Sequence, residues 1–335
     1  MSPAFGEGAM MRFRRRQFLH LAAVAAALPI APRIARPQAY PTRPVRLVIG
    51  FPPGGAIDVV ARIIGQWLSE RLGQPFVIEY RPGASTNIGA EVVVRAPPDG
   101  HTLLLTATVN AINVTLYEKL SFNFIQDIAP IAGIIRFSNV MEVNPSFPAK
   151  TVPEFIAYAK ANPDKINMAS PGIGTVSHVA GEMFKIMTGV KIVHVPYRGA
   201  PPALTDLLGG QVQGMIDSIP ASIEYIRAGR VRALAVTSAS RFEGLPDVPT
   251  VGEFVPGYEA STWFGIGAPS NTPGEVIETL NKEINAGLAN QKVKAQLENI
   301  GGTVLALSPA AFGTLIADDI EKWAKVVKFS GAKAE

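Results

Sequence analysis

The amino-acid sequence predicts an α/β fold, and two observations support this prediction. Strand-like and helix-like segments alternate in two series, the first starting at Val45 and the second near Val152. Such alternation is typical of sheets covered by helices. The chain has 335 residues, of which 47% are hydrophobic and 17% charged, so it is long and apolar enough to form two lobes with a sizeable core.

The first 39 residues predict an export signal that precedes the fold. Arg14-Arg15-Arg16-Gln17-Phe18-Leu19 is followed by a short apolar run at 21–30. A basic segment and a short apolar segment are typical of secretory signals, and the twin arginine indicates the Tat type. We expect cleavage after Ala39 and a periplasmic protein, although Pro37 fits the cleavage pattern poorly. An uncleaved anchor is the alternative reading, and Met11 is an alternative start.

The charge balance argues against nucleic-acid or membrane-surface binding. Residues 1–39 hold six of the 31 basic residues and one of the 27 acidic residues, so the mature chain carries 25 basic and 26 acidic residues. No strongly basic field is therefore expected. The lack of cysteine excludes disulfides, thiolate metal sites and cysteine nucleophiles.

The first series of elements is bounded by glycine and proline turns. It predicts strands at 45–51, 76–80 and 101–106 and a helix around 90–95. A further helix follows the first strand and stops at Gly73; its apolar residues at helical spacing are Ile57, Val60, Ala61, Ile64 and Leu68.

The second series is longer. It predicts helices at 152–161, around 180–187, at 202–208 and at 220–228, and strands at 166–169, 191–195, 212–217, 231–237 and 262–268. A loop-rich stretch fills 238–258, and only helices are expected afterwards, at 273–289, 292–299 and 309–329.

A chain end made only of helices has no sheet of its own, so we predict that it packs back on the first series. The expected division is a first lobe of 40–140 and 263–335, and a second lobe of 141–262. Crossover strands are expected near 134–143 and 261–268.

Motifs for catalysis or cofactors are weak. Neither Gly54-Gly55 nor Gly172-Ile-Gly174 completes a nucleotide-binding glycine pattern, and the Gly-x-Ser-x-Gly elbow is absent. The mature histidines (His101, His178 and His194) have no metal-site spacing. Ser177 beside His178 is more simply read as a helix cap than as a nucleophile–base pair. No cofactor or metal and no catalytic residue is predicted.

Two loops do suggest anion binding, because each leads from a strand into a helix through small residues. They are Pro53-Gly-Gly-Ala56 and Gly172-Ile-Gly-Thr-Val-Ser177. A helix N-terminus offers free N–H groups and a partial positive charge, and glycine allows close approach. Loops of this kind in both lobes could hold a carboxylate between them. The alternative is that both are ordinary strand–helix turns.

Residues 40–335 resemble the periplasmic receptors of the tripartite tricarboxylate transporter family, also called Bug proteins. The segments that carry the resemblance are Phe51-Pro-Pro-Gly-Gly-Ala-Ile-Asp-Val-Val-Ala-Arg62, Leu72-Gly-Gln-Pro-Phe-Val-Ile-Glu-Tyr-Arg-Pro-Gly83, Asn87-Ile-Gly-Ala90, Pro98-Asp-Gly-His-Thr-Leu-Leu-Leu105, Val195-Pro-Tyr-Arg-Gly199, Ala203-Leu-Thr-Asp-Leu-Leu-Gly-Gly-Gln-Val212 and Asp247-Val-Pro-Thr-Val251. The resemblance implies a type II periplasmic-binding-protein fold, with two α/β lobes, crossover strands and a ligand cleft between the lobes.

The resemblance also implies the ligand-binding residues. In the first lobe they are Phe51, Gly54, Gly55, Ala56, Ile57, Asn87, Thr106, Ala107, Thr108 and Asn110; in the second they are Ser170, Gly172, Gly174, Thr175, Ser177, Tyr197, Arg198, Gly199, Asp217 and Ser218. Asn87 could instead cap its own helix. Asp217 could be a solvated strand end, and Arg198 a surface ion pair.

Three positions depart from the family pattern, namely Ile57, Tyr80 and His101. An isoleucine near the ligand favours a less polar acid than citrate. The expected function is an extracytoplasmic receptor, monomeric and not an enzyme, that captures a small carboxylate by hinge closure and delivers it to a membrane permease. The alternatives are a ligand sensor for a signalling partner and a secreted hydrolase on the same scaffold.

Overall fold

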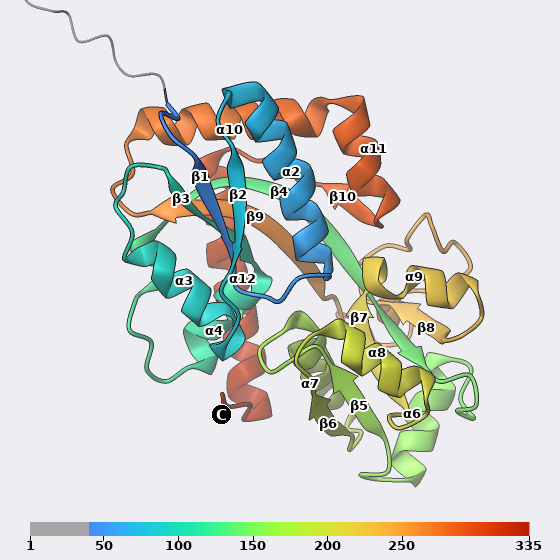
Figure 1. The fold of residues 1–335 in the computed structure, drawn as a ribbon. Coiled ribbons are helices and arrows are strands. Elements are labelled where there is room, and N and C mark those ends of the chain that lie inside the picture. Colours follow the sequence, from blue (N-terminus) through green and yellow to red (C-terminus); the bar gives the residue numbers. More distant parts are fainter. Residues whose placement is uncertain (1–39, 335) are drawn as a thin grey trace, which may run out of the picture. The chain divides into compact units, whose positions relative to one another are not determined.

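One ten-stranded sheet runs through the described part of the chain, which is residues 40–334 of a computed structural model. The strand order is β2-β1-β3-β9-β4-β7-β5-β6, and β10 and β8 also pair with β4. Helices cover the sheet (Figure 1), so the predicted α/β class is confirmed. The predicted export signal lies outside the described residues.

The first half of the sheet begins with three parallel strands. These are β1 (Val45–Ile49), β2 (Phe76–Tyr80) and β3 (Thr102–Ala107), connected by α2 (Ala56–Leu72), the short turn η1 (Ala84–Thr86) and α3 (Asn87–Val94). The long strand β9 (Ser261–Pro269) lies antiparallel beside β3. Gly73 ends α2 with a φ of 72°, a left-handed conformation that glycine adopts without steric cost, as the sequence predicts.

Strand β4 (Ile128–Val143) belongs to both halves of the sheet. Its first part pairs with β9 and with β10 (Gly302–Val304), and its last residues pair with β7 (Gly214–Ser218) and β8 (Arg232–Val236). The sequence predicts this crossover only for 134–143; the strand starts earlier because Ile128 already pairs with Pro269. The lobe boundaries at 140/141 and 262/263 stay a prediction.

The second half alternates strands and helices much as expected. Its further elements are α6 (Val152–Ala161), β5 (Asn167–Ser170), α7 (Val176–Thr188), β6 (Val193–Pro196), α8 (Ala200–Leu208), α9 (Ile219–Arg227) and η2 (Val251–Glu253). Strand β5 is parallel to both β6 and β7. The carboxyl ends of β5, β6 and β7 therefore lie at one edge, where α7, α8 and α9 begin.

Three elements are absent from the sequence prediction. Helices α4 (Thr108–Leu116) and α5 (Phe124–Asp127) follow β3, and β10 lies between α11 (Gln291–Asn299) and α12 (Pro309–Ser330). The expectation that only helices follow β9 is therefore wrong. Three residues are too few to show strand periodicity, and β10 exists because β4 offers it an edge.

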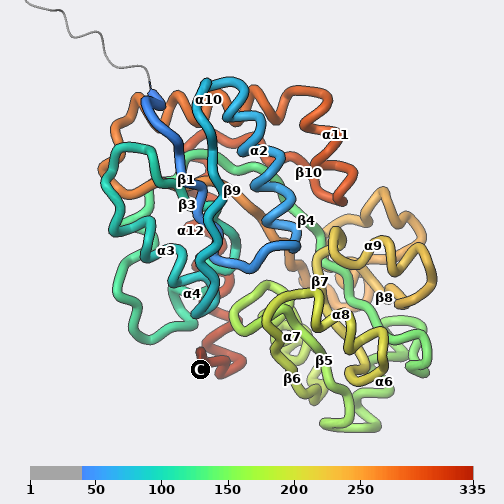
Figure 2. Tube along the Cα trace, viewed as in Figure 1, coloured from blue at the N-terminus to red at the C-terminus, as the bar shows by residue number. Residues whose placement is uncertain are grey.

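The C-terminal helices pack on earlier parts of the chain. Helix α10 (Gly274–Ala289) contacts α2, where the indole N–H of Trp67 donates to the Glu283 carbonyl at 2.8 Å. Helix α12 contacts both α4 and α7 (Figures 1 and 2). Its Phe312 lies in a core cluster with Trp263, whereas its Trp323 lies in a separate cluster with Phe184. Helix α12 thus stabilises both halves. Within residues 40–334, no helix combines the length and apolarity needed to cross a membrane.

Candidate ligand-binding site

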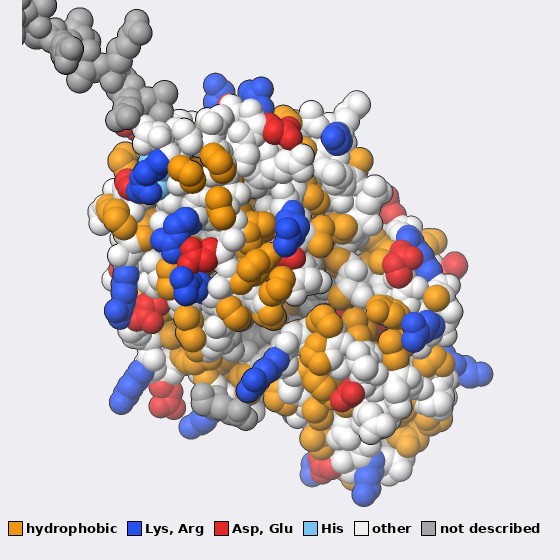
Figure 3. Space-filling view, viewed as in Figure 1, with side chains coloured by type: hydrophobic (Ala, Val, Ile, Leu, Met, Phe, Trp, Pro, Cys, Tyr) orange, Lys and Arg blue, Asp and Glu red, His pale blue; other side chains and the backbone are white. Residues whose placement is uncertain are grey.

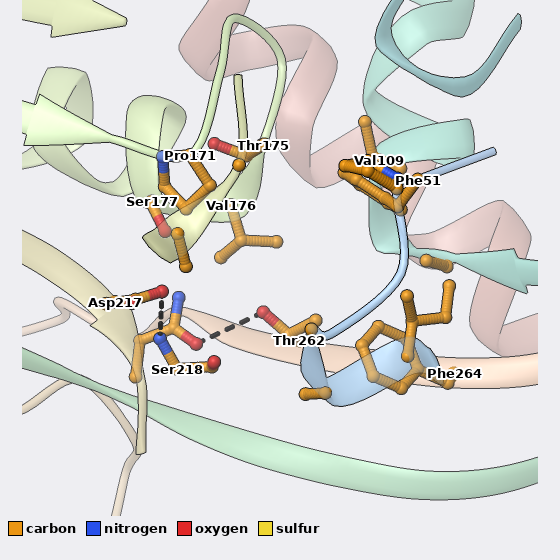
Figure 4. Close-up of a pocket in the computed structure, with 18 of the residues that line it drawn as sticks. Phe51, Val109, Pro171, Thr175, Val176, Ser177, Asp217, Ser218, Thr262 and Phe264 are labelled. Carbon is orange, nitrogen blue, oxygen red and sulfur yellow. Dashed lines mark hydrogen bonds between the residues drawn. The ribbon is translucent and has the colours of Figure 1, made fainter. Parts of the chain in front are cut away.

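A cavity of about 120 Å³ lies where the two halves of the sheet face each other (Figure 4). Figure 4 shows Phe51, Val109 and Phe264 on one side of it. Ser177, Asp217 and Ser218 lie on the other side. The complete lining is Phe51, Pro52, Pro53, Gly55, Ala56, Ile57, Ala107, Val109, Asn139, Pro171, Thr175, Val176, Ser177, Gly199, Ala200, Pro201, Asp217, Ser218, Thr262 and Phe264.

Four helices begin at this cavity. The residues that precede α2, α7, α8 and α9 are Gly55, Thr175, Gly199 and Ser218, and all four line it. The first N–H groups of a helix have no partner within the helix and carry a partial positive charge. The cavity is therefore built to attract an anion.

The four helix starts do not contribute equally. Prolines occupy the first turns of α8 and α9, and proline has no N–H to donate. Helices α2 and α7 have backbone N–H groups throughout their first turns. The first two residues of each helix line the cavity: Ala56 and Ile57 of α2, and Val176 and Ser177 of α7. These are the two loops in which the sequence predicts anion binding.

The loop before α2 is held in place by a buried acid. Asp58 accepts a hydrogen bond from the Gly54 N–H at 3.0 Å and from the Tyr80 hydroxyl at 2.7 Å, and forms an ion pair with Arg62 at 3.1 Å. Asp58 supports the first turn of its helix, as expected. Tyr80 contributes to this support through its hydroxyl.

The loop before α7 is organised by two histidines that lie beneath it. His178 Nδ1 accepts from the Gly174 N–H at 3.1 Å, and His194 Nε2 lies 2.6 Å from the Ser170 hydroxyl. The two rings stack with 4.0 Å between centroids. Burial lowers the pKa of His178 to about 4 and that of His194 to about 3, so both rings are neutral near pH 7. Thr175 hydroxyl caps α7 by accepting from the His178 N–H at 3.3 Å.

Among residues 40–334, the cavity wall is mainly apolar and contains a single ionisable side chain, Asp217. Asp217 is 2% exposed; its Oδ1 accepts from the Ser218 N–H at 2.7 Å, while its Oδ2 has no hydrogen-bond partner among residues 40–334. Burial raises the pKa of Asp217 to about 7. Lysine, arginine and histidine are absent from the lining. Any bound anion must therefore be held by dipoles and hydrogen bonds.

A second buried acid lies near Asp217 but outside the lining. Glu142 on β4 is fully buried; its Oε1 accepts from the Ser222 hydroxyl at 2.7 Å, and its Oε2 is unpaired among the described residues. Burial, together with the nearby Asp217, raises the pKa of Glu142 to about 8. Both carboxyl groups are consequently easier to keep neutral than ordinary acids.

A groove of about 360 Å³ continues the cavity toward the surface. Gly55, Ala56, Ala200, Pro201 and Ser218 line both. The outer groove passes between α2, α8 and α9, and Figure 3 shows hydrophobic side chains around the hollow in this region. The groove provides a route from the surface to the cavity.

The structure brings half of the predicted site residues together at the cavity. Those that line it are Phe51, Gly55, Ala56, Ile57, Ala107, Thr175, Ser177, Gly199, Asp217 and Ser218. Those that lie elsewhere are Gly54, Asn87, Thr106, Thr108, Asn110, Ser170, Gly172, Gly174, Tyr197 and Arg198.

Several of the residues that lie elsewhere support the start of α4. Asn110 Oδ1 accepts from the Ala107 N–H at 2.9 Å, and its Nδ2 donates to the Thr86 hydroxyl at 3.0 Å. Thr108 hydroxyl accepts from the Trp263 N–H at 2.9 Å. Asn87 Oδ1 accepts from Asn113 at 3.0 Å. Thr106 is fully buried, and its hydroxyl has no partner within residues 40–334.

The others shape loops of the second half. Ser170 and Gly172 exchange hydrogen bonds at 3.2 Å, and Gly174 packs against Asn113 and Leu116 of α4, away from the cavity. Tyr197 donates to Asp206 at 2.6 Å. Gly54 lines the outer groove, and Arg198 is exposed.

Sequence reasoning missed the residues contributed by the crossover strands. Asn139 of β4 and Thr262 of β9 line the cavity, and the Thr262 hydroxyl donates to Asn139 Oδ1 at 3.1 Å, which leaves the Asn139 amide hydrogens for another acceptor. Both strands are predicted as crossovers, so a polar residue within each is an available signal. Pro53 and Val176 belong to the two predicted loops, and Val109 lies between predicted residues. The remaining lining residues, which the sequence did not predict, are Pro52, Pro171, Ala200, Pro201 and Phe264, and they are apolar and carry no such signal.

Comparison with known proteins gives a consistent result. The family described as tripartite tricarboxylate transporter family receptor matches residues 60–331. Protein BugT of Bordetella pertussis is 36% identical over 297 residues, which cover 88% of this chain and 91% of BugT.

Solved structures show the same fold. The structure of R. palustris Rpa4515 with adipate has a TM-score of 0.84 at 39% identity and covers 87% of this chain and 98% of that chain. The periplasmic binding protein BugD has a TM-score of 0.81 at 35% identity, covering 88% of this chain and all of its own. The predicted periplasmic-binding-protein fold is confirmed. The chain therefore belongs to the receptors of the tripartite tricarboxylate transporter family.

Proposed function

We propose that this protein is an extracytoplasmic receptor that captures a small carboxylate in the cavity and delivers it to a tripartite tricarboxylate-type membrane permease. The observation that carries the proposal is the convergence of four helix N-termini on a cavity whose lining has no basic side chain. Backbone N–H groups at the starts of α2 and α7 bind one carboxylate from two sides.

Capture works by closing the two lobes, 40–140 with 263–335 and 141–262, on the ligand. A ligand that contacts both α2 and α7 stabilises the closed arrangement, because only that arrangement supplies both sets of contacts. The loops before α2 and α8 also approach each other closely, since a Cβ on Gly199 would lie 3.8 Å from Cγ of Pro52.

The ligand is an acid with an apolar body. Phe51, Ile57 and Phe264 supply apolar surface to the cavity. The adipate bound to the relative Rpa4515 has this character, a carboxylate at each end of a chain of methylenes.

Catalysis is not part of the proposed function. Ser177 lines the cavity, but the ring nitrogen of its neighbour His178 accepts from the Gly174 N–H. The serine that a histidine does contact, Ser170, lies outside the lining together with His194. Demonstrated turnover of a bound acid would overturn this part of the proposal. A role as ligand sensor for a signalling partner stays the alternative, and a transport assay in a strain that lacks the protein separates it from the receptor role.

Export of the chain through the Tat route, removal of residues 1–39 and a monomeric mature protein in the periplasm complete the proposal. The twin arginine at the start of the signal supports the route.

A thermal-shift screen tests the proposed function. The purified protein is heated with adipate, malate, benzoate, glutamate and, as a neutral control, adipamide. A ligand that binds only the folded state raises the melting temperature, so we expect a rise with at least one acid and none with adipamide. A flat response to all acids, with no acid released on denaturation as judged by mass spectrometry, would contradict the proposal.

A further inference from the structure

We propose that Asp217 binds the ligand as a neutral carboxylic acid that donates a hydrogen bond to a carboxylate oxygen of the ligand, so that capture of the anion takes up a proton. This inference rests on the proposed function, because it concerns how the same cavity recognises a carboxylate. Asp217 is then the residue through which the cavity distinguishes an anionic ligand from a neutral or cationic one.

The position of Asp217 is the first argument. It is the penultimate residue of β7, followed by Ser218 and then by α9, and it lines the cavity beside Ser177 and Ser218 (Figure 4). Its Oδ1 accepts from the Ser218 N–H, whereas its Oδ2 is covered by protein and has no partner among residues 40–334, so Oδ2 meets a ligand once the side chain turns toward the cavity. A buried polar atom without a partner costs free energy, and a ligand atom that pairs with it recovers that cost.

The cavity would also have to accommodate the charges of the bound carboxylate and of Asp217 together. A bound carboxylate and an ionised Asp217 would place two negative charges in one cavity whose lining supplies no cation. Two carboxylates that share a site do not both ionise, and one of them holds a proton between them. Because the ligand anion also accepts from the N–H groups of α2 and α7, the proton belongs on Asp217.

The surroundings of Asp217 offer no other charge to compensate it. Elements that pack on β7 carry these ionisable groups: Arg136 and Glu142 on β4, His178, Glu182 and Lys185 on α7, Asp206 on α8, and Glu224 and Arg227 on α9. Arg136 is exposed, Lys185 pairs with Glu182, Asp206 with Tyr197, and Arg227 with Glu224. Glu142 is the group whose ionisation is linked to Asp217, and it is itself an acid.

The proton balance is simple. Solvent supplies one proton to Asp217, the new O–H donates to the ligand, and no covalent bond within the ligand changes. The burial that raises the pKa of Asp217 to about 7 makes the free protein partly ionised above neutral pH. Proton uptake on binding should therefore be small at pH 6 and approach one per ligand at pH 8.5, with affinity falling up to about tenfold per pH unit in that range.

Isothermal titration calorimetry measures this uptake directly. Adipate is titrated at pH 6 and pH 8.5 in phosphate and in Tris, and the difference in heat between buffers gives the number of protons taken up. Glutamate is titrated in parallel, because an ammonium group is the other partner that a buried carboxylate could take. Malate and benzoate are used in the same way if they give the larger thermal shift.

Two variants at Asp217 and one beside it sharpen the test. Asp217→Asn keeps a hydrogen-bond donor but cannot titrate, so we expect binding within about threefold of the wild-type value at pH 6, no proton uptake and no pH dependence. Asp217→Leu removes the donor and cannot titrate, so we expect binding about tenfold weaker than that of the wild type at pH 6 and no dependence on pH. Glu142→Gln is the matched control, because it removes a buried carboxyl outside the lining and should keep proton uptake.

The outcomes are distinguishable. Binding without proton uptake by the wild type, uptake that persists in Asp217→Asn, or a preference for glutamate that Asp217→Asn abolishes would each overturn the role of Asp217 while leaving the receptor function intact. Absence of binding by every acid would contradict the receptor function itself. Circular dichroism of each variant shows whether it is folded.

Discussion

The hydroxyl of Ser85 donates a 2.6 Å hydrogen bond to the carbonyl oxygen of Ile173. This bond joins the turn η1 in the first half of the fold to the loop that precedes α7 in the second. The turn itself is unusual, because Ala84, Ser85 and Thr86 all have positive φ, between 45° and 77°. Asn113 holds it by donating to the Ser85 carbonyl at 2.6 Å. The strained turn η1 therefore contacts the loop before α7. We propose that this loop closes on the ligand.

Ser85→Ala should weaken ligand binding more than it weakens the fold. A hydrogen bond of this kind contributes about 1 kcal/mol, which corresponds to a roughly fivefold rise in Kd if the bond forms mainly in the closed arrangement. Calorimetric titration with adipate gives the Kd. Ser121→Ala, which removes an exposed serine hydroxyl bonded to Glu91, is the control and should leave the Kd unchanged. Equal effects of the two variants would count against the bridge.

Gly174→Ala should displace the loop before α7. A Cβ at this position would lie 2.7 Å from Leu116 and 3.0 Å from Asn113, and its φ is +78°. Gly189→Ala is a matched control, since its φ is +70° but a Cβ there meets no atom within 4 Å. Backbone strain costs each variant about 1 kcal/mol, so Gly189→Ala reports strain alone. We expect urea denaturation to show a greater loss of unfolding free energy for Gly174→Ala than for Gly189→Ala. Adipate binding should weaken in Gly174→Ala and stay unchanged in Gly189→Ala.

Ile57→Thr should shift preference toward hydroxy acids. Ile57 lines the cavity and is 5% exposed, so its replacement removes apolar contact with the methylenes of adipate. We expect the binding free energy of adipate to weaken by about 1 kcal/mol. That of malate should weaken less, or improve, because its hydroxyl can pair with the new threonine hydroxyl. Val77→Thr on β2, 51% exposed and part of neither the cavity nor the outer groove, should change neither Kd. An unchanged ratio of the two affinities would refute a role of Ile57 in selection.

Glu142→Gln should stabilise the protein at alkaline pH relative to the wild type. The pKa of Glu142 is raised by burial from 4.5 to about 8, so between these values the folded state holds a proton that the unfolded state has lost. Wild-type stability therefore falls as pH rises through this window, by up to about 1.4 kcal/mol per pH unit from this group. Glutamine does not titrate and removes the effect. Urea denaturation of both proteins at pH 5, 6.5 and 8 checks whether the difference in unfolding free energy between variant and wild type grows with pH. A difference that is the same at all three pH values would exclude a link between the ionisation of Glu142 and stability.

Much of the fold could be predicted because its signals are local. Helix α2 has apolar residues at helical spacing and a glycine at its end, and α6 (Val152–Ala161) has the bounds expected from its pattern. Helix α4 escaped prediction because β-branched and asparagine residues favour other structures. It forms because Asn110 bonds back to Ala107 and because α12 packs on it, and neither contact is visible in a local pattern.

The candidate site could be predicted to a similar degree. The loops at Gly55 and Thr175 are recognisable because small residues stand between a strand and a helix. Asn139 and Thr262 lie inside long strands, and only the pairing of β4 with β9 brings them to the cavity. The family pattern alone could not show that Gly174 and Asn110 support neighbouring elements while Val109 reaches the cavity wall.

The placement of α12 has a consequence for how the chain is made. Phe312 completes one core cluster and Trp323 another, and both lie on α12, which follows the other described elements in the chain. Domains usually fold as units during synthesis, each when its own residues have left the ribosome. Here these two clusters are incomplete until α12 has emerged. A chain that lacks α12 therefore loses part of both clusters at once, one in each half of the fold.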